Sequence, residues 1–325
     1  MSSNKKVCVV GAGYWGKNHI RTFHELGALG GIVETNNELL ESFSEKYQDV
    51  LTYQNLDDAL GNNEFDGFTV ATPAETHFNV AKNIILAGKH TLVEKPIALN
   101  IKDAEELVNL ANKHAVNLMV GHVLLFHPAI IKIKELINDG KIGKLQYIYS
   151  NRLNLGQVRT EENVFWSLAP HDIAIFQYFI DSFPVEIIAQ GSTFLQKGIH
   201  DSTITQLKYP NNVEGHIFVS WLHPFKEHRL VVIGSESMIT FEDSSKGKPL
   251  KLYSKKFDMK NDIPEKIDGP VELIKYEQKM PLTEELSYFT EHLGGKTPGI
   301  ANGDHALAVT KILVQASKQL QSASS

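Results

Sequence analysis

Cysteine is almost absent from this sequence, and long apolar runs are missing from its start. Cys8 is the only cysteine among 325 residues, so no disulfide can form within the chain and no thiolate cluster can hold a structural metal. The polar N-terminal stretch "MSSNKK" leads into a short apolar run, and no run of about 18 apolar residues follows it. We therefore expect a cytoplasmic protein with no membrane partner.

An excess of positive charge is missing too. The 32 Lys and Arg residues are outnumbered by 38 Asp and Glu residues, which gives a formal net charge of −6. Such a chain has no global positive field that would attract a polyanion, so we expect no nucleic-acid partner. The 42% of hydrophobic and 22% of charged residues are typical of a globular protein, and the length predicts two domains.

The first 122 residues alternate short apolar runs with amphipathic stretches. Runs such as "KVCVV" and "HTLVEK" are almost continuous in apolar residues, as in parallel strands that are buried on both faces. Stretches such as "DAEELVNLANKHA" between them have helical spacing. This α/β pattern predicts a doubly wound domain at residues 1–122, an N-terminal Rossmann dinucleotide-binding domain.

From residue 123 the pattern changes to longer stretches that alternate apolar and polar residues. They run from "KLQYIYSNRLN" to "MITFED" and are separated by turn signals such as "YPNNVEG". Residues 123–325 are therefore predicted to form an α+β domain with a large, mostly antiparallel open sheet, for substrate binding and oligomerisation. Because few helices cover this sheet, we expect a homo-oligomer, a dimer or a tetramer.

The turn "GAGYWG" follows the first apolar run and begins a helical stretch. Its three glycines have the spacing for a tight turn, close approach of backbone N–H groups to a pyrophosphate, and close helix–strand packing. Such turns also occur without a cofactor, but Glu34 at the end of the second run strengthens the signal, because a carboxylate there would bind the adenosine ribose and repel a 2′-phosphate. We expect NAD, bound by Gly11, Gly13, Tyr14, Trp15, Gly16 and Glu34.

Two further strands end in polar residues and proline, in "VATPAETH" and "HTLVEKPIA". The carboxyl ends of parallel strands meet at one edge of a sheet, where the cofactor crevice of this architecture lies. Lys95 follows one of these strands, and Pro96 restricts its backbone to extended conformations. The arrangement predicts that the Lys95 amine points into the crevice. The alternative is an ordinary surface lysine, which is the most common kind. We assign no chemistry to Glu94.

Together these motifs resemble the Gfo/Idh/MocA (glucose-fructose oxidoreductase / inositol dehydrogenase) family. The resemblance is carried by "GAGYWG", "ATPAETH" (71–77), "EKPIA" (94–98), "GHVLLFHPA" (121–129) and "PHDI" (170–173). It implies that Lys95 lies beside the nicotinamide, that His171 of the second domain faces it, and that the Lys95–Pro96 bond is cis. Family members often have an aspartate four residues before this histidine, where this chain has Ser167, so a Lys-Asp-His triad is not carried over.

Lys95 and His171 are therefore the expected catalytic residues. Oxidation of a secondary alcohol sends a hydride to the nicotinamide and needs a group that accepts the hydroxyl proton. "SLAPHDIAIFQYFI" predicts a helix with Pro170 in its first turn, where the helix dipole disfavours a protonated His171. We favour His171 as the base with Lys95 holding the hydroxyl, and the opposite assignment stays open.

Residues 150–173, "SNRLNLGQVRTEENVFWSLAPHDI", are rich in hydrogen-bond donors. Guanidinium groups suit bidentate binding of phosphate or carboxylate, and a Trp ring can pack on a sugar or base. The candidate ligands are Asn151, Arg152, Asn154, Gln157, Arg159 and Trp166. The alternative is a solvated loop in which Arg159 pairs with Glu161 or Glu162.

This segment also resembles the nucleotide-sugar branch of the family. That resemblance implies NAD-dependent oxidation of C3 of UDP-N-acetylglucosamine, or of its uronic acid, to a 3-keto sugar for later transamination in lipopolysaccharide biosynthesis. Three alternatives stay open: an inositol or simple sugar dehydrogenase, a reductase that works in the opposite direction, and a non-catalytic NAD-binding regulator. The presence of both Lys95 and His171 argues against the regulator.

Overall fold

The structure, a computed structural model, describes residues 5–322 and divides into two compact units. Unit 1 contains the chain up to Phe126 together with Lys279–Lys311, and unit 2 contains His127–Gln278 together with the chain from Ile312. The polar N-terminal start lies partly in residues 1–4, outside the described residues. Within residues 5–322, no helix is long and apolar enough to cross a membrane, and no group of three or more His, Cys, Asp or Glu could hold a metal ion.

Unit 1 is built on a six-stranded sheet with the order β3-β2-β1-β4-β5-β6, in which all neighbours are parallel. Its strands are β1 (Val7–Val10), β2 (Leu29–Val33), β3 (Leu51–Tyr53), β4 (Gly67–Val70), β5 (His90–Glu94) and β6 (Leu118–Gly121). Its helices up to residue 126 are α1 (Gly16–Glu25), α2 (Asn37–Lys46), α3 (Leu56–Gly61), η1 (Ala74–Thr76), α4 (His77–Leu86), α5 (Ile101–Lys113) and η2 (Val123–Phe126). This doubly wound order confirms the predicted Rossmann domain.

Local sequence signals explain these elements. Strands β1, β4 and β6 are buried along their whole length, as expected for parallel strands covered on both faces. Three helices begin after an asparagine whose side chain accepts a backbone N–H of the first turn: Asn36, Asn55 and Asn100. The apolar runs and caps therefore specify where the strands end and the helices begin.

The segment Lys279–Lys311 belongs to unit 1, so the division of the chain differs from the predicted boundary after residue 122. Helix α8 (Pro281–Glu291) packs against α1, and a Cβ added to Gly67 of β4 would lie 2.5 Å from Leu293 and 3.1 Å from Phe289. Helix α9 (Gly303–Ser322) begins in unit 1, where Ala306 joins the apolar core. The apolar faces of these helices cover the first sheet, which the order of elements along the chain did not reveal.

Unit 2 is built on an eight-stranded sheet with the order β14-β13-β12-β11-β7-β10-β9-β8. Its strands are β7 (Leu145–Leu153), β8 (Glu186–Ser192), β9 (Ser202–Tyr209), β10 (Val213–Ser220), β11 (Glu227–Gly234), β12 (Met238–Glu242), β13 (Leu250–Lys260) and β14 (Ile263–Ile274). Its helices before residue 279 are α6 (Pro128–Asn138), α7 (Val164–Ile180) and η3 (Pro210–Asn212). Only β7 and β10 pair in parallel, so the predicted mostly antiparallel sheet is confirmed.

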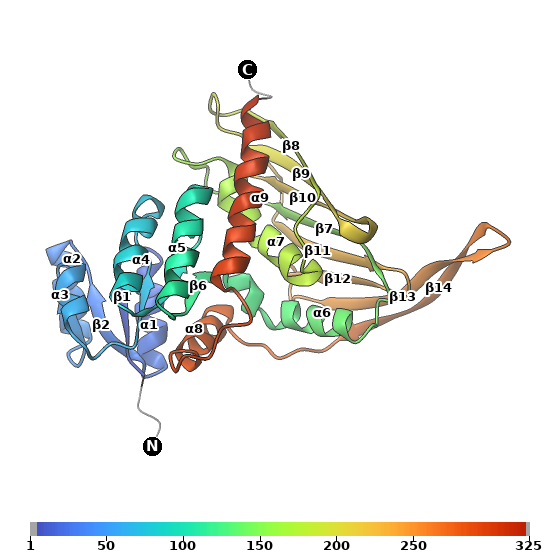
Figure 1. Ribbon diagram of the computed structural model, residues 1–325. Coiled ribbons are helices and arrows are strands. Elements are labelled where there is room, and N and C mark those ends of the chain that lie inside the picture. The colour runs from blue at the N-terminus through green and yellow to red at the C-terminus, as the bar shows by residue number, and fades with distance from the viewer. Residues whose placement is uncertain (1–4, 323–325) are drawn as a thin grey trace. The chain divides into compact units, whose positions relative to one another are not determined.

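Helices α6 and α7 lie on one face of this second sheet (Figure 1). Helix α7 packs against β7, β9 and β10, and the side chains of β9 alternate between buried and exposed. Strands β13 and β14 form a long hairpin that extends past the ends of the other strands of the sheet (Figure 1), and the sequence analysis did not predict it. Its turn residues Asn261 and Asp262 have φ values of 51° and 64°, the left-handed conformation of a two-residue hairpin turn.

Candidate active site

The glycine-rich turn between β1 and α1 is tightly packed at its first and third glycines and open at the second. Gly11 has a φ of 91°, and a Cβ added to it would lie 2.9 Å from the carbonyl oxygen of Ala71. A Cβ on Gly16 would collide with the carbonyl oxygen of Gly11, whereas a Cβ on Gly13 would meet nothing within 4 Å. The turn therefore needs Gly11 and Gly16 for its own geometry and leaves open space at Gly13, as pyrophosphate binding requires.

The carboxylate of Glu34 lies directly beside this turn. One oxygen accepts the backbone N–H of Ala12 at 2.8 Å, and the other accepts that of Asn36 at 2.9 Å. The hydroxyl of Thr35 also donates to Oε1 at 3.4 Å, whereas Oε2 has a further lone pair, so Glu34 can also accept a hydrogen bond from a ribose hydroxyl. The open glycine, the start of α1 and this acid together fit NAD, while the rings of Tyr14 and Trp15 are exposed and their contact with the cofactor stays a prediction.

His77 connects the ends of β4 and β5. Its ring is 2% exposed, and its Nε2 and Nδ1 lie 2.9 Å from the carbonyl oxygen of Thr72 and 2.7 Å from that of Pro96. The Lys95–Pro96 peptide bond is cis, as the family resemblance implied. The ring therefore links the backbone on both strand ends, a role that the position of His77 at the start of a helix did not indicate.

Lys95 directly follows β5 at the carboxyl edge of the parallel sheet. Glu94 pairs with Gly121 in the sheet register, so His122 is the residue of β6's end that corresponds to Lys95. His122 is 3% exposed, and neither of its ring nitrogens has a hydrogen-bond partner among the described residues. Burial, His305 and Lys95 together lower the pKa of His122 well below its ordinary value, so an uncharged imidazole accompanies the amine. Sequence analysis missed this residue, although "GH" directly after a strand was the available signal.

His171 lies in α7 of unit 2, but its place in the helix differs from the prediction. Helix α7 begins at Val164 after the N-cap Asn163, so Pro170 lies inside the helix and not in its first turn. Pro170 has no N–H, which leaves the carbonyl group of Trp166 without its usual helical partner. The helix dipole acts within about the first turn. The dipole argument for an uncharged His171 is therefore wrong.

Next to His171, Asp172 forms a buried bidentate ion pair with Arg152 of β7. Arg152 Nε lies 2.8 Å from Asp172 Oδ2 and Nη2 lies 3.0 Å from Oδ1, with the side chains 10% and 3% exposed. Burial opposes the charge on Arg152, but Asp172 outweighs it and raises the pKa of the guanidinium above its ordinary value. Arg152 therefore attaches α7 to the sheet beside His171, and its binding of a substrate anion stays a prediction.

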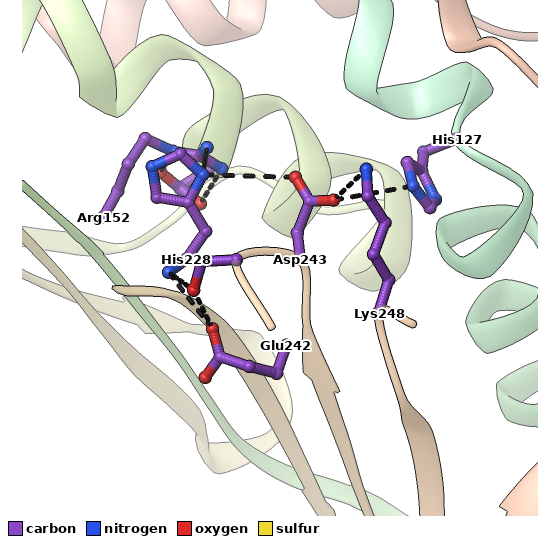
Figure 2. A network of polar contacts seen from close by, with 8 residues as sticks. His127, Arg152, His228, Glu242, Asp243 and Lys248 are labelled. Atoms are coloured by element: carbon purple, nitrogen blue, oxygen red, sulfur yellow. Dashed lines mark hydrogen bonds and ion pairs between the residues drawn. The ribbon is translucent and has the colours of Figure 1, made fainter. Parts of the chain in front are cut away.

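Figure 2 shows how polar contacts continue from this ion pair. Arg152 Nη1 lies 3.4 Å from His228 Nδ1, and Asp243 Oδ2 lies 4.0 Å from the same nitrogen. The other oxygen of Asp243 lies 2.7 Å from Lys248 Nζ and 3.7 Å from His127 Nε2. Burial and the charge of Arg152 lower the pKa of His228 to about 3. His228 is therefore uncharged at neutral pH, and the network is held by paired cations and anions.

Three other candidate donors of residues 150–173 have partners within the chain as well. Three of their contacts are Asn151 to Glu227 at 2.8 Å, Trp166 Nε1 to Ser317 at 2.8 Å, and Arg159 Nε to Glu162 at 3.3 Å. The alternative pairing of Arg159 with Glu162 is therefore confirmed. Lys95 lies in unit 1 and His171 lies in unit 2.

Comparison with known proteins matches both parts of the chain to one family. Residues 5–122 match the GFO_IDH_MocA description "Oxidoreductase family, NAD-binding Rossmann fold", and residues 130–240 match the "GFO/IDH/MocA C-terminal domain". The chain is 24% identical over 325 residues to the uncharacterized oxidoreductase YrbE of Bacillus subtilis, which covers 96% of this chain and 93% of that protein.

The chain is also similar to a UDP-N-acetylglucosamine 3-dehydrogenase of Acidithiobacillus ferrooxidans. The identity is 28% over 184 residues, and this match spans 56% of each protein. The solved structure of UDP-N-acetylglucosamine 3-dehydrogenase GnnA from that organism superposes with a TM-score of 0.85 at 21% identity, over 98% of this chain and 97% of that one. At this identity the structural likeness shows the shared fold.

Proposed function

Because the chain belongs to the Gfo/Idh/MocA family of NAD-binding oxidoreductases, we propose that it oxidises a secondary alcohol of a sugar to a ketone. The observation that carries the proposal is the edge of the parallel sheet, where Gly13, Glu34 and Lys95 follow β1, β2 and β5. The cofactor, when bound, supplies the hydride acceptor. Binding, orientation and proton transfer are left to the side chains of the chain itself.

Lys95 and His171 are the proposed catalytic residues. In this proposal the Lys95 ammonium group holds the substrate hydroxyl, and His171 accepts its proton as the alcohol becomes a ketone. The ion pair between Arg152 and Asp172 keeps α7, and with it His171, attached to the second sheet. A base held on a rigid element transfers the proton without first losing conformational freedom.

We propose UDP-N-acetylglucosamine, or its uronic acid, as the substrate, with oxidation at C3 to a 3-keto sugar. The similarity to a UDP-N-acetylglucosamine 3-dehydrogenase supports this choice. The ion pairs of Arg152 and Arg159 favour a second candidate, an inositol or an uncharged sugar, because both guanidinium groups are engaged by carboxylates. A cytoplasmic location, a homo-oligomeric state and a role in lipopolysaccharide biosynthesis stay predictions.

The test is an assay of the purified protein with NAD against separate UDP-sugars, free sugars and inositols. Reduced nicotinamide is followed by absorbance and the loss of two hydrogens from the substrate by mass spectrometry. A keto acid such as 2-oxoglutarate is included to reoxidise tightly held NADH, because slow NADH release would hide turnover. Oxidation of UDP-N-acetylglucosamine supports the first candidate, and oxidation of free sugars or inositols alone supports the second. NAD binding without turnover of any alcohol would overturn the dehydrogenase proposal.

A further inference from the structure

A buried histidine connects helix α1 to the end of strand β5. His19 is the fourth residue of α1, and its side chain is 0% exposed. Its Nε2 donates a hydrogen bond to Oε1 of Glu94, the last residue of β5, at 2.7 Å. In the sheet, β4 lies between β5 and β1, the strand that α1 follows. The His19 ring therefore connects two parts of unit 1 that are not neighbours in the sheet and lie 75 positions apart in the chain.

This histidine is costly to bury. Its second ring nitrogen, Nδ1, is buried and has no hydrogen-bond partner among the described residues. The ring of Phe23, one turn further along α1, lies 6.5 Å away between the ring centroids. A buried nitrogen without a partner loses its hydrogen bonds to water, so an apolar side chain would fill this space at lower cost. What a histidine adds at this position is the hydrogen bond to Glu94.

The carboxylate of Glu94 binds the backbone of Lys95 as well as the ring of His19. Its Oε2 accepts the backbone N–H of Lys95 at 3.2 Å, and its side chain is 12% exposed. The side chain of Lys95 extends from the residue whose N–H this bond holds. A shift of the carboxylate would therefore also shift the point from which the amine extends.

The neighbouring strand leaves room for this carboxylate. Gly121 of β6 is the register partner of Glu94, and a Cβ added to Gly121 would lie 2.8 to 3.0 Å from the three carboxyl atoms of Glu94. Real Cβ atoms are almost never found so close to another heavy atom. The carboxylate thus occupies the space that a side chain at position 121 would need, which limits the positions that Glu94 can adopt.

We propose that His19 is a positioning residue for Lys95. It fixes the Glu94 carboxylate relative to α1, and the carboxylate fixes the backbone at Lys95. Because α1 begins at the glycine-rich turn, one chain of hydrogen bonds then runs from the helix at the proposed cofactor site to the lysine that holds the substrate hydroxyl. The inference rests on the proposed function, since it assumes that Lys95 acts on the substrate. A reacting group that is misplaced by about 1 Å can lose about 10²-fold in rate.

The first test replaces His19 in two ways. His19→Gln keeps an N–H donor that can lie near the position of Nε2, so kcat should stay within about threefold of the wild-type value. His19→Leu removes the donor, so kcat should fall about tenfold while KM for NAD stays unchanged. His24→Leu, which changes an exposed histidine of the same helix, is the matched control. A purely structural His19 would lower the Tm of His19→Leu and leave the kcat of the folded protein at the wild-type value, which would overturn the proposal.

A second variant displaces the same carboxylate without removing any hydrogen-bonding group. The added methyl group of Gly121→Ala needs the space of the Glu94 carboxylate, so kcat should again fall about tenfold, and this variant decides the matter if His19→Leu does not fold. Because both changes act through Glu94, the double variant should lose little more than the larger single loss. Two losses that multiply, or a wild-type kcat in Gly121→Ala, would contradict a path through Glu94.

Hydrogen exchange at the Lys95 amide tests the connection without any substrate. Measured by NMR, this exchange should be about tenfold faster in His19→Leu than in the wild type, with His19→Gln close to the wild type. Equal exchange in all three proteins overturns the proposal. Faster exchange in a protein that oxidises no alcohol supports the connection and means that the proposed function alone has failed. A calorimetric NAD titration completes the test, because a more than about tenfold weaker affinity in His19→Leu would place the effect at the glycine turn and overturn the path through Glu94.

Discussion

The two units each bury a cluster of charged side chains, but the clusters are balanced in different ways. In unit 2 the buried Arg152 is paired with Asp172, and the partly exposed Lys248 with Asp243. In unit 1 the carboxylate of Glu94 accepts one hydrogen bond from the buried ring of His19 and one from the backbone N–H of Lys95. We infer that the paired cations of unit 2 serve the fold, whereas Glu94 of unit 1 supports the residue that follows it.

The comparison also separates residues that look alike in the sequence. Arg152 and Lys95 are both cations at or just after the end of a strand, and both were candidates for ligand binding. Arg152 is anchored by an acid 20 positions further along the chain, which the sequence cannot show because the pair joins β7 to α7. Lys95 is next to a glutamate that is itself held by other residues. Only the structure shows that the charge of Arg152 is paired with a carboxylate of the chain itself.

The largest effect is expected from Lys95→Met. This variant should bind NAD almost normally and lose about 10³-fold in kcat, because the ammonium group that holds the reacting hydroxyl is removed at similar side-chain length. NADH formation at saturating substrate and a calorimetric NAD titration measure the two properties. Lys102→Met, an exposed lysine of α5, is the control. Normal turnover of Lys95→Met would show that Lys95 is not a catalytic residue.

Arg152→Met should have the largest effect on stability. Removing the guanidinium leaves Asp172 buried and unpaired, which should lower the free energy of unfolding by about 3 to 5 kcal/mol. Urea denaturation measures this loss. The double variant Arg152→Met with Asp172→Leu removes both charges and should recover most of the stability. A single variant as stable as the wild type would contradict the role of this pair in the fold.

Glu34→Ala should weaken NAD binding by about 10- to 100-fold, because hydrogen bonds from the ribose to a carboxylate are lost. NADP affinity should fall less, or rise, since the carboxylate no longer repels the 2′-phosphate. Titration with both cofactors gives the ratio of affinities. Glu38→Ala, an exposed acid of α2, should leave that ratio unchanged. If the ratio of NAD to NADP affinity is unchanged in Glu34→Ala, Glu34 only stabilises the glycine turn through its hydrogen bond with the backbone N–H of Ala12.

The smallest effect on stability is expected from Arg159→Ala. Arg159 and Glu162 are 53% and 32% exposed, and such an exposed ion pair contributes about 0 to 1 kcal/mol. The same variant distinguishes the two candidate substrates. If Arg159 leaves Glu162 to bind a diphosphate, KM for the UDP-sugar should rise while KM for a free sugar stays constant. An equal effect on both values would remove Arg159 from the substrate site.

Sequence patterns predicted the first sheet well because its signals are local. Apolar runs marked five of its strands, and short motifs marked the glycine turn and Glu34, while the cis Lys95–Pro96 bond was implied by the family resemblance. Strand β3 was missed because only "LTY" is paired, with Leu51 42% exposed, so no apolar run marks it. Short motifs thus predict the cofactor site, whereas the edge strand β3 is recognisable only from its pairing with β2.

The second unit was harder to predict because its elements depend on long-range contacts. Strands β13 and β14 are rich in Lys, Asp and Glu and mostly exposed, so no alternating apolar pattern indicates them, although Asn261–Asp262 was an available turn signal. Pro170 suggested the start of a helix, whereas Asn163 is the true N-cap of α7. The Arg152–Asp172 pair forms only when β7 and α7 are packed together. In unit 2 the sequence indicated which residues carry charge, but not which residues they pair with.

The missing side chain of Gly121 makes positions 94 and 121 interdependent for any protein engineer. The carboxyl group of Glu94 fills the volume that a larger residue at 121 would require. In a library that randomises both codons, alanine or larger residues at 121 should be recovered only in clones in which position 94 has become smaller. If only one of the two positions is randomised, selection should return the original residue. The strand end before Lys95 can therefore be redesigned only by changing positions 94 and 121 together.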